Sequence, residues 1–452
     1  MRLKRVGVPK RMESRPRWLG MGALAMTVLG LVNAPAFGAE VSYFYGYRGE
    51  FSDNIQRVAT NPQHDMVNVV VAGLSYQDRS RTLEMRLAPS VEFIDYRKNS
   101  FADETRLNLD SLLLWTLSPQ RLTWTAEDAV RQVRIDPTQP DTPTNTAVAN
   151  FFSTGPDIYL RAGSVNTLQL GGRYGDVYVS DTNLDNQRTL YYGRWLYQTS
   201  PLTTLSLNYE TEAVDFDDKL SNVNFQRRDA FFRIQTRTSQ SDFSLDAGKS
   251  TISRDGTSDA EATLARLSWN RRLNAESTFG VAAESSLSDT GSDLASTAAS
   301  ANNPGQGTTG SVSQNLVTQD IFRAKRGEIS YSRFSSRLKT NFRVFARSLE
   351  FQATPTNDRD EAGGEVSIGY FYSSAMSIDL FYSRVRADYR NQTLVDADST
   401  VGLGVTRLIT RNVSTVLRVQ QDQRESTNAT REFVDNRIIF SVTYSSGLLP
   451  RR

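Results

Sequence analysis

Polar and apolar side chains alternate along most of the chain with a period of two residues. Residues 338–348 show the pattern clearly: even positions are apolar or small, and odd positions are polar or charged with one exception. The odd positions are Lys339, Asn341, Arg343, Phe345 and Arg347. A period of two predicts a β-strand whose two faces meet different surroundings. What those surroundings are depends on how often the pattern repeats and on what separates the repeats.

Similar strand-like segments recur from Val41 to Tyr444, and connections of two sizes alternate between them. Long polar loops, such as residues 137–150 and 215–224, lie near the middle of the intervals between short turns. The short turns are predicted at residues 79–81, 118–120, 163–165, 200–202, 239–241, 274–277, 335–337, 373–375 and 410–412. This is an up-and-down meander with short turns at one end and long loops at the other.

That asymmetry is typical of transmembrane barrels, which have short periplasmic turns and longer extracellular loops. Ten pairs of strands predict an all-β, single-domain antiparallel barrel of about 20 strands (18–20) over residues 39–452. Apolar runs of roughly 7–11 residues are long enough for tilted strands to cross the hydrocarbon core. A soluble propeller also repeats at about 40 residues, but its blades need four strands and a recurrent motif, which this sequence lacks.

The alternation changes phase inside one predicted strand. Its apolar residues are even at first and odd afterwards: Met376, Ile378, Leu380 and Tyr382, then Val385, Ala387 and Tyr389. Either a β-bulge shifts the strand by one residue, or its charged outer end projects above the membrane. The sequence leaves both explanations open.

The first 38 residues have the three parts of a secretory signal peptide. A basic region with seven Lys or Arg residues precedes a short apolar core at residues 19–32. Ala36 and Gly38 are the small residues of a cleavage site, which predicts a cut before Ala39. The expected location is the outer membrane of a Gram-negative bacterium. Because the predicted barrel begins directly after the cut, we expect no plug domain and no gated, energy-coupled receptor.

Composition narrows the chemistry. The chain has no cysteine, which excludes disulfides and thiolate metal sites, and a net charge of +2, which gives no field directed at nucleic acid. His64 is the one histidine, and its place in an outer loop does not suit a catalytic base. Glu210 and Glu212 have the chemistry of calcium ligands, but on an alternating strand they are more simply lumen charges. We expect no enzyme, no metal and no cofactor.

The segment 47–57 has the character of a motif. It carries a glycine, an aromatic residue and then Asp53, Asn54, Ile55 and Arg57 at the end of the first predicted strand. Together with the layout of signal peptide and meander, it resembles the putative β-barrel porins of type two, which include outer-membrane proteins found with exopolysaccharide gene clusters. The resemblance implies an outer-membrane pore that serves polysaccharide secretion. Asp53 and Asn54 also suit a plain turn, and the two interpretations are compatible.

The predicted faces nominate pore-lining and interface residues. The candidate pore-lining residues are Arg233, Arg237, Lys339, Arg343, Arg347, Arg418, Glu210 and Glu212. Basic residues gathered on one wall would select anionic solutes such as acidic sugars, whereas charges paired across strands would only stiffen the wall. The candidate aromatic girdle, beside the short turns, is Trp115, Trp124, Trp195, Trp269 and Tyr372.

The tract 288–315 breaks the rhythm of the meander. It is rich in Ser, Thr, Gly, Ala and Asn and has no period. It either folds into the barrel and narrows it, as constriction loops do in porins, or forms a long flexible loop outside. Its lack of aromatic residues favours the loop outside.

The sequence therefore predicts an outer-membrane pore that takes part in exopolysaccharide export. The expected partners are outer-membrane lipid, the polysaccharide and other components of a secretion system. A general diffusion porin and a surface-exposed structural or adhesin barrel are the alternatives.

Overall fold

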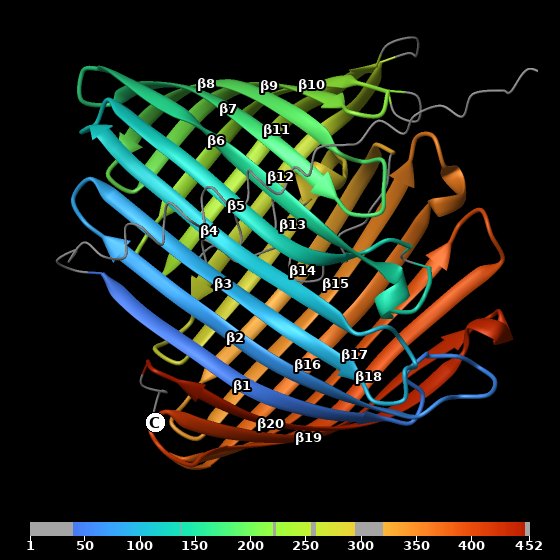
Figure 1. Cartoon of the computed structure of the whole chain (residues 1–452). Coiled ribbons are helices and arrows are strands. Elements are labelled where there is room, and N and C mark those ends of the chain that lie inside the picture. The colour runs from blue at the N-terminus through green and yellow to red at the C-terminus, as the bar shows by residue number, and fades with distance from the viewer. Residues whose placement is uncertain (1–38, 137, 220–222, 255–258, 294–319, 448–452) are drawn as a thin grey trace, which may run out of the picture. The chain divides into compact units, whose positions relative to one another are not determined.

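The computed structural model describes residues 39–136, 138–219, 223–254, 259–293 and 320–447, and the predicted signal peptide lies outside them. Within this part of the chain, twenty strands form one antiparallel sheet in which each strand pairs with its sequence neighbours (Figure 1). Pairing of the first strand with the last, from Phe44 opposite Ser445 to Ser52 opposite Arg437, closes the sheet. The predicted up-and-down barrel of about 20 strands is confirmed.

The strands are 12–17 residues long. They are β1 (Glu40–Ser52), β2 (Asp65–Arg79), β3 (Leu83–Tyr96), β4 (Glu104–Ser118), β5 (Leu122–Arg134), β6 (Thr146–Ala162), β7 (Asn166–Val179), β8 (Asn186–Ser200), β9 (Thr203–Phe216), β10 (Phe225–Arg237), β11 (Ser241–Arg254), β12 (Ala260–Arg272), β13 (Ser277–Ser288), β14 (Phe322–Phe334), β15 (Leu338–Phe351), β16 (Arg359–Ser373), β17 (Met376–Tyr389), β18 (Leu394–Leu408), β19 (Val413–Ser426) and β20 (Phe433–Ser445). Three 3-10 turns lie in the long connections: η1 (Pro143–Asn145), η2 (Pro355–Asn357) and η3 (Ala429–Arg431).

The nine predicted short turns fall at the nine observed junctions at one end of the barrel. Gly163 opens the turn between β6 and β7 with φ of 74°, a left-handed conformation that glycine adopts without steric cost. The register shifts by a residue beside three other short turns, at Thr116/Ser118, Gln198/Ser200 and Phe371/Ser373. Tight turns therefore set the register, and the bulges remain close to them.

The outer face of the barrel is apolar. In β15 the outward Phe342 and Val344 are 44% and 36% exposed, whereas the inward Arg343 side chain is 12% exposed. Large apolar side chains that remain exposed in this regular arrangement form a band that water would disfavour and lipid would cover. Among the described residues, no helix is long and apolar enough to cross a membrane.

The change of phase in β17 is not a bulge. Its pairing with β18 runs without a register shift, so side chains alternate strictly along the whole strand. Tyr389 consequently points inward and is 2% exposed, while Arg386 and Asp388 point outward and are exposed. Of the two explanations, the charged outer end is correct: at this end of β17 the outward side chains lie beyond the apolar band of the barrel.

Apolar side chains line the inside of the barrel at its long-loop end. One cluster joins Val177, Val214 and Phe225 of the wall to Leu184 and Ile321 of the long connections. Two smaller clusters lie on β2 and β3 with loop residue Ile55, and on β14 and β15. The long connections thus fold back onto the inner wall, which a simple inside-polar pattern does not predict.

The two faces of β15 should respond differently to an added aspartate. Val344→Asp places a carboxylate in the apolar band and should lower the free energy of unfolding by roughly 1–2 kcal/mol. Asn341→Asp adds the same acid to the lumen face, where Arg343 stands two residues away, and should cost little. Urea unfolding in lipid vesicles, followed by tryptophan fluorescence, measures both. Equal losses would contradict the assignment of faces.

Candidate functional site: the lumen wall

The structure places all eight candidate pore-lining residues on the inner face. They come from β9 (Glu210, Glu212), β10 (Arg233, Arg237), β15 (Lys339, Arg343, Arg347) and β19 (Arg418). They do not converge on one constriction, because these strands are spread around the barrel. Their surroundings divide them into two groups: most are paired in mid-barrel, whereas Arg237 and Lys339 lie near the short turns.

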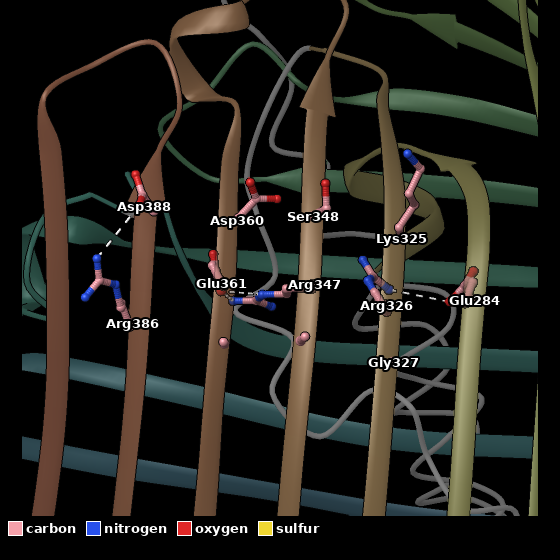
Figure 2. A pocket seen from close by; sticks show the side chains of 12 residues that line it. Glu284, Lys325, Arg326, Gly327, Arg347, Ser348, Asp360, Glu361, Arg386 and Asp388 are labelled. Carbon is pink, nitrogen blue, oxygen red and sulfur yellow. Dashed lines mark hydrogen bonds and ion pairs between the residues drawn. The ribbon is translucent and has the colours of Figure 1, made fainter.

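In the middle of the wall, arginines pair with carboxylates on neighbouring strands. Arg343 Nη2 lies 2.6 Å from Glu365 Oε1 on β16. Glu361 is buried and pairs with Arg347 (Figure 2). It also accepts a hydrogen bond of 2.5 Å from Arg359 Nε, so it lies between two arginines. Of the two roles open to these charges, cross-strand pairing is therefore the one that the structure places in mid-barrel.

The same arrangement continues around the barrel. Further pairs are Arg131–Asp110, Arg173–Asp157, Arg194–Glu210, Arg227–Glu212, Arg233–Asp246, Arg326–Glu284 and Arg437–Glu50. We call this belt the arginine ring. Its guanidinium groups also stack on inward aromatic rings, with Arg343 5.8 Å from the ring centre of Phe345 and Arg418 5.1 Å from that of Phe381. This stacking explains Phe345, the apolar exception in the alternation of β15.

The outer side of this wall has a shallow hollow of ≈ 540 Å³ over β14–β17 (Figure 2). Gly327, Ala346 and Ala362 leave the space, and Lys325 and Arg386 border it. It lies where the outer face changes from apolar to charged.

Arg188 and two arginines of the ring hold the start of the long connection after β13 against the inner wall. Arg188 pairs with Asp289, Arg227 Nη1 donates to Ser292 Oγ at 3.0 Å, and Arg326 Nη2 donates to Asp293 Oδ2 at 3.1 Å. We call residues 289–293 the inward turn. For this part of the tract 288–315, the expectation of a loop outside the barrel is wrong; residues 294–319 lie outside the described residues.

The inward turn owes its place to charge. Burial opposes the ionisation of Asp289, but the charge and hydrogen bond of Arg188 hold the pKa of Asp289 below its ordinary value. The residues that clamp the turn come from β8, β10 and β14. None of these three arginines is among the candidate pore-lining residues, and a period of two carries no signal of which distant side chain an inward arginine will meet.

A second connection, between β5 and β6, reaches a distant part of the wall. Arg57 Nη1 donates to the Asp141 carbonyl at 3.2 Å, and Arg424 Nη1 donates to the Thr138 carbonyl at 3.0 Å. Arg431, in η3, also donates to the Thr138 carbonyl. We call residues 138–145 the crossing loop; it links β5–β6 to β19, six strands away around the sheet.

The motif at residues 47–57 fastens the seam of the barrel. Asp53 accepts two hydrogen bonds of 2.8 Å from the backbone and side chain of Asn436 on β20. Asn54 donates to the carbonyls of Val58 and Val434 at 2.8 and 3.0 Å. Asp53 and Asn54 thus form the turn their chemistry suggested, and also tie the first loop to the last strand.

The girdle candidates lie on the outer face near the short turns. Trp115, Trp124, Trp195 and Tyr372 are 48%, 38%, 50% and 71% exposed, and Trp269 is half-buried against Phe279. The indole N–H groups of Trp124, Trp195 and Trp269 donate to Thr154, Asn166 and Ser241. An apolar ring with a satisfied polar tip suits the border of a bilayer.

Below the arginine ring, toward the short turns, many inward side chains are neutral and polar. They include Gln169, Gln198, Gln235, Ser268, Asn270, Ser330, Asn341, Ser367 and Thr443. Hydroxyl and amide groups both donate and accept hydrogen bonds. The same half also carries charged inward side chains, among them the pair Glu84–Arg86 and Asp379. Between them, this half of the lumen wall can hydrogen-bond water or a hydroxylated solute.

His64 lies beside Lys98 Nζ and 6.3 Å from the Phe51 ring centre, in the first long connection. Over the described part of the chain, no three His, Asp or Glu side chains are grouped to hold a metal ion.

The sequence matches no family model, and no curated protein is significantly similar to it. The fold is similar to that of a mutant of the ferric enterobactin receptor PfeA of Pseudomonas aeruginosa, at 12% identity over 90% of this chain and 80% of that chain, with a TM-score of 0.48. The siderophore receptor PirA of Acinetobacter baumannii gives 9% identity, 89% and 80% coverage and a TM-score of 0.45. OmpTdeltaL8, a loop deletion mutant of the outer membrane protein OmpT of Vibrio cholerae, is 11% identical over 90% of this chain and 99% of that chain, with a TM-score of 0.36.

Similarities of this size carry no inference about solute or mechanism. The chain is an outer-membrane β-barrel of the Gram-negative type, because it has a closed sheet, an apolar outer band and the strand lengths that a bilayer needs.

Removing one carboxylate from the arginine ring should destabilise the barrel. Glu361→Gln leaves Arg347 and Arg359 buried with reduced compensation, and should lower the free energy of unfolding by about 3 kcal/mol. Glu425→Gln, which breaks the exposed Arg384–Glu425 pair on the outer face, is the control and should change little. Urea titrations of refolded protein give both values. A Glu361→Gln barrel as stable as the control would show that the ring adds nothing.

Loosening the clamp should release the inward turn. Asp289→Asn removes the charge that Arg188 binds, so backbone amides of residues 288–293 should exchange hydrogen about tenfold faster at pH 7. Hydrogen exchange with mass spectrometry measures this. The control, Asp259→Asn, removes one charge from an exposed loop residue and should leave the rate unchanged. Exchange that Asp289→Asn leaves unaffected would mean that apolar packing alone holds the turn.

Proposed function

We propose that this barrel is an outer-membrane pore that carries a hydrophilic solute, and that the solute is an exported polysaccharide. One observation carries the proposal: between the arginine ring and the short-turn mouth the inner wall is largely polar, while the outer wall is apolar. Polar groups that line the inside of a membrane barrel require water or a hydrophilic solute beside them. A sheet of 20 strands is wide enough to enclose an aqueous lumen.

The neutral lower wall supports a sugar polymer as solute. Side chains such as Gln198, Asn270 and Ser330 offer donors and acceptors without fixed charge, so a hydroxylated chain exchanges hydrogen bonds with them at little net cost. The resemblance of residues 47–57 to exopolysaccharide-associated porins points in the same direction. The proposal contains no catalytic step.

The inward turn and the crossing loop would narrow this pore. Each is held by three arginines that lie far from it in the sequence, and each lies toward the long-loop end. In porins, loops that fold inward set the size limit of the channel. We therefore infer that the narrowest part lies at the outer end, above a wider lower lumen.

Planar bilayers test the pore. Purified barrel should give discrete conductance steps, and Asp289→Asn should increase their size or their noise because the inward turn is less restrained. Asp259→Asn is again the control. A barrel that inserts, as heat-modifiable gel mobility would demonstrate, but never conducts would favour the structural or adhesin alternative.

Deletion of the gene in the source bacterium tests the solute. An export pore should reduce the amount or chain length of secreted polysaccharide, with restoration by the wild-type gene. Unchanged polysaccharide, together with slower uptake of small hydrophilic solutes, would favour a general diffusion porin.

A further inference from the structure

The two ends of the barrel carry opposite charge. The nine short turns, taken with three strand residues on each side, contain twelve Lys or Arg and four Asp or Glu, a balance of +8. Glu40 at the start of β1 adds one acid to this end. The ten long connections, counted in the same way over the described residues, contain 14 Lys or Arg and 27 Asp or Glu, a balance of −13. The near-zero net charge of the whole chain conceals this separation.

Several of the short-turn cations point into the lumen. Arg237 follows the inward Arg233 by four residues on β10, Arg272 follows the inward Arg266 by six on β12, and Lys339 precedes the inward Arg343 by four on β15. Arg237 bonds Asp242 at 3.0 Å but its side chain remains 63% exposed. These three residues, which we call the mouth cations, stand at the edge of the neutral lower wall.

The mouth cations differ from the arginine ring in what surrounds them. In the ring, Arg347 and Arg359 share Glu361 and all three are buried, so their field is largely cancelled. The mouth cations are exposed, although Asp242 pairs with Arg237 and Asp379 lies across Gly369 from Lys339. The excess of positive charge over the whole short-turn end extends over about a Debye length, ~8 Å at physiological salt. A charged rim on a low-dielectric wall concentrates counter-ions at the opening.

We propose that the short-turn mouth is the entrance for a polyanion, a carboxylated or otherwise acidic polysaccharide that enters from the periplasmic side. This rests on the proposed function as a pore, and names the charge of its solute. Successive acid groups on one chain bind several mouth cations at once, while the neutral wall above offers hydrogen bonds without trapping the chain. The acidic long-loop end disfavours the return of the same polymer from outside.

The test uses two triple variants with the same loss of charge at the same end. The first, Arg237→Gln, Arg272→Gln and Lys339→Gln, removes the mouth cations. The second, Arg271→Gln, Arg333→Gln and Arg407→Gln, removes three cations from the outer face, where odd positions of β12, β14 and β18 point. Each triple variant breaks one exposed ion pair, Arg237–Asp242 in the first and Arg333–Glu276 in the second. The two variants are therefore matched in the charge and in the ion pairs that they lose.

The probe is a defined oligogalacturonate, with a neutral dextran oligomer of similar length as its control. Each is added to one side of a bilayer containing the barrel. Ser336→Cys introduces a thiol in a short turn of a chain that has no cysteine. Labelling this thiol from one side of the bilayer shows which side the short turns face. The galacturonate should block current at a lower concentration from the short-turn side than from the long-loop side, and dextran should not block.

The mouth triple should weaken that block at least about tenfold, and the outer triple should leave it within about threefold. Equal weakening by both triples, or equal block by galacturonate and dextran, would overturn the proposal; weakening by the outer triple alone would assign the rim to lipid headgroups or an acidic protein partner. A barrel that shows no conductance fails the pore proposal instead. Binding of fluorescent galacturonate to detergent-solubilised wild type and mouth triple then tests the entrance without an open channel, and equal affinity would overturn it.

Discussion

Closure of the sheet is the constraint on which the rest of the structure depends. In lipid, every backbone N–H and C=O must find its partner within the protein, and pairing of β1 with β20 joins the first and last strands of the described sheet into a closed ring. Once the sheet is closed, a strict period of two gives each strand one face for lipid and one for the lumen. Asp53 and Asn54 reinforce the seam by tying the first loop to β20.

The inner face uses its charges chiefly on itself. Arginine suits a buried ring because its planar guanidinium group can bond two carboxylates and stack on an aromatic ring, as Arg343 does with Glu328, Glu365 and Phe345. Such a belt stiffens the wall and holds the inward turn and the crossing loop. Because its charges are compensated, it has little field left with which to choose a solute. In the proposed pore, selection by charge would therefore fall to the exposed ends of the barrel, where the charges are separated by sign.

Adaptation to the membrane also explains why apolar residues change sides at the outer ends of strands. In the middle of β17, the outward Leu380 meets lipid; farther along, the outward Arg386 meets water and the inward Tyr389 is covered by the barrel itself. The inner apolar clusters are the places where the long connections fold back. One barrel therefore carries two apolar surfaces, an outer one for lipid and an inner one for its own loops.

Local pattern in the sequence determined much of this protein: the positions of the short turns, the number of strands and the inward direction of Arg343, Arg347 and Glu210. These follow from turn chemistry and a period of two, which neighbouring residues specify among themselves. The partners of those residues could not be predicted, because Arg188 and Asp289 or Arg57 and Asp141 meet only after many strands have closed into a ring. The tertiary structure alone decided that the ring is neutralised, that the first residues of the tract 288–315 turn inward, and that β17 passes its phase change without a bulge. Those outcomes depend on where lipid ends and on which distant side chains face one another across the lumen.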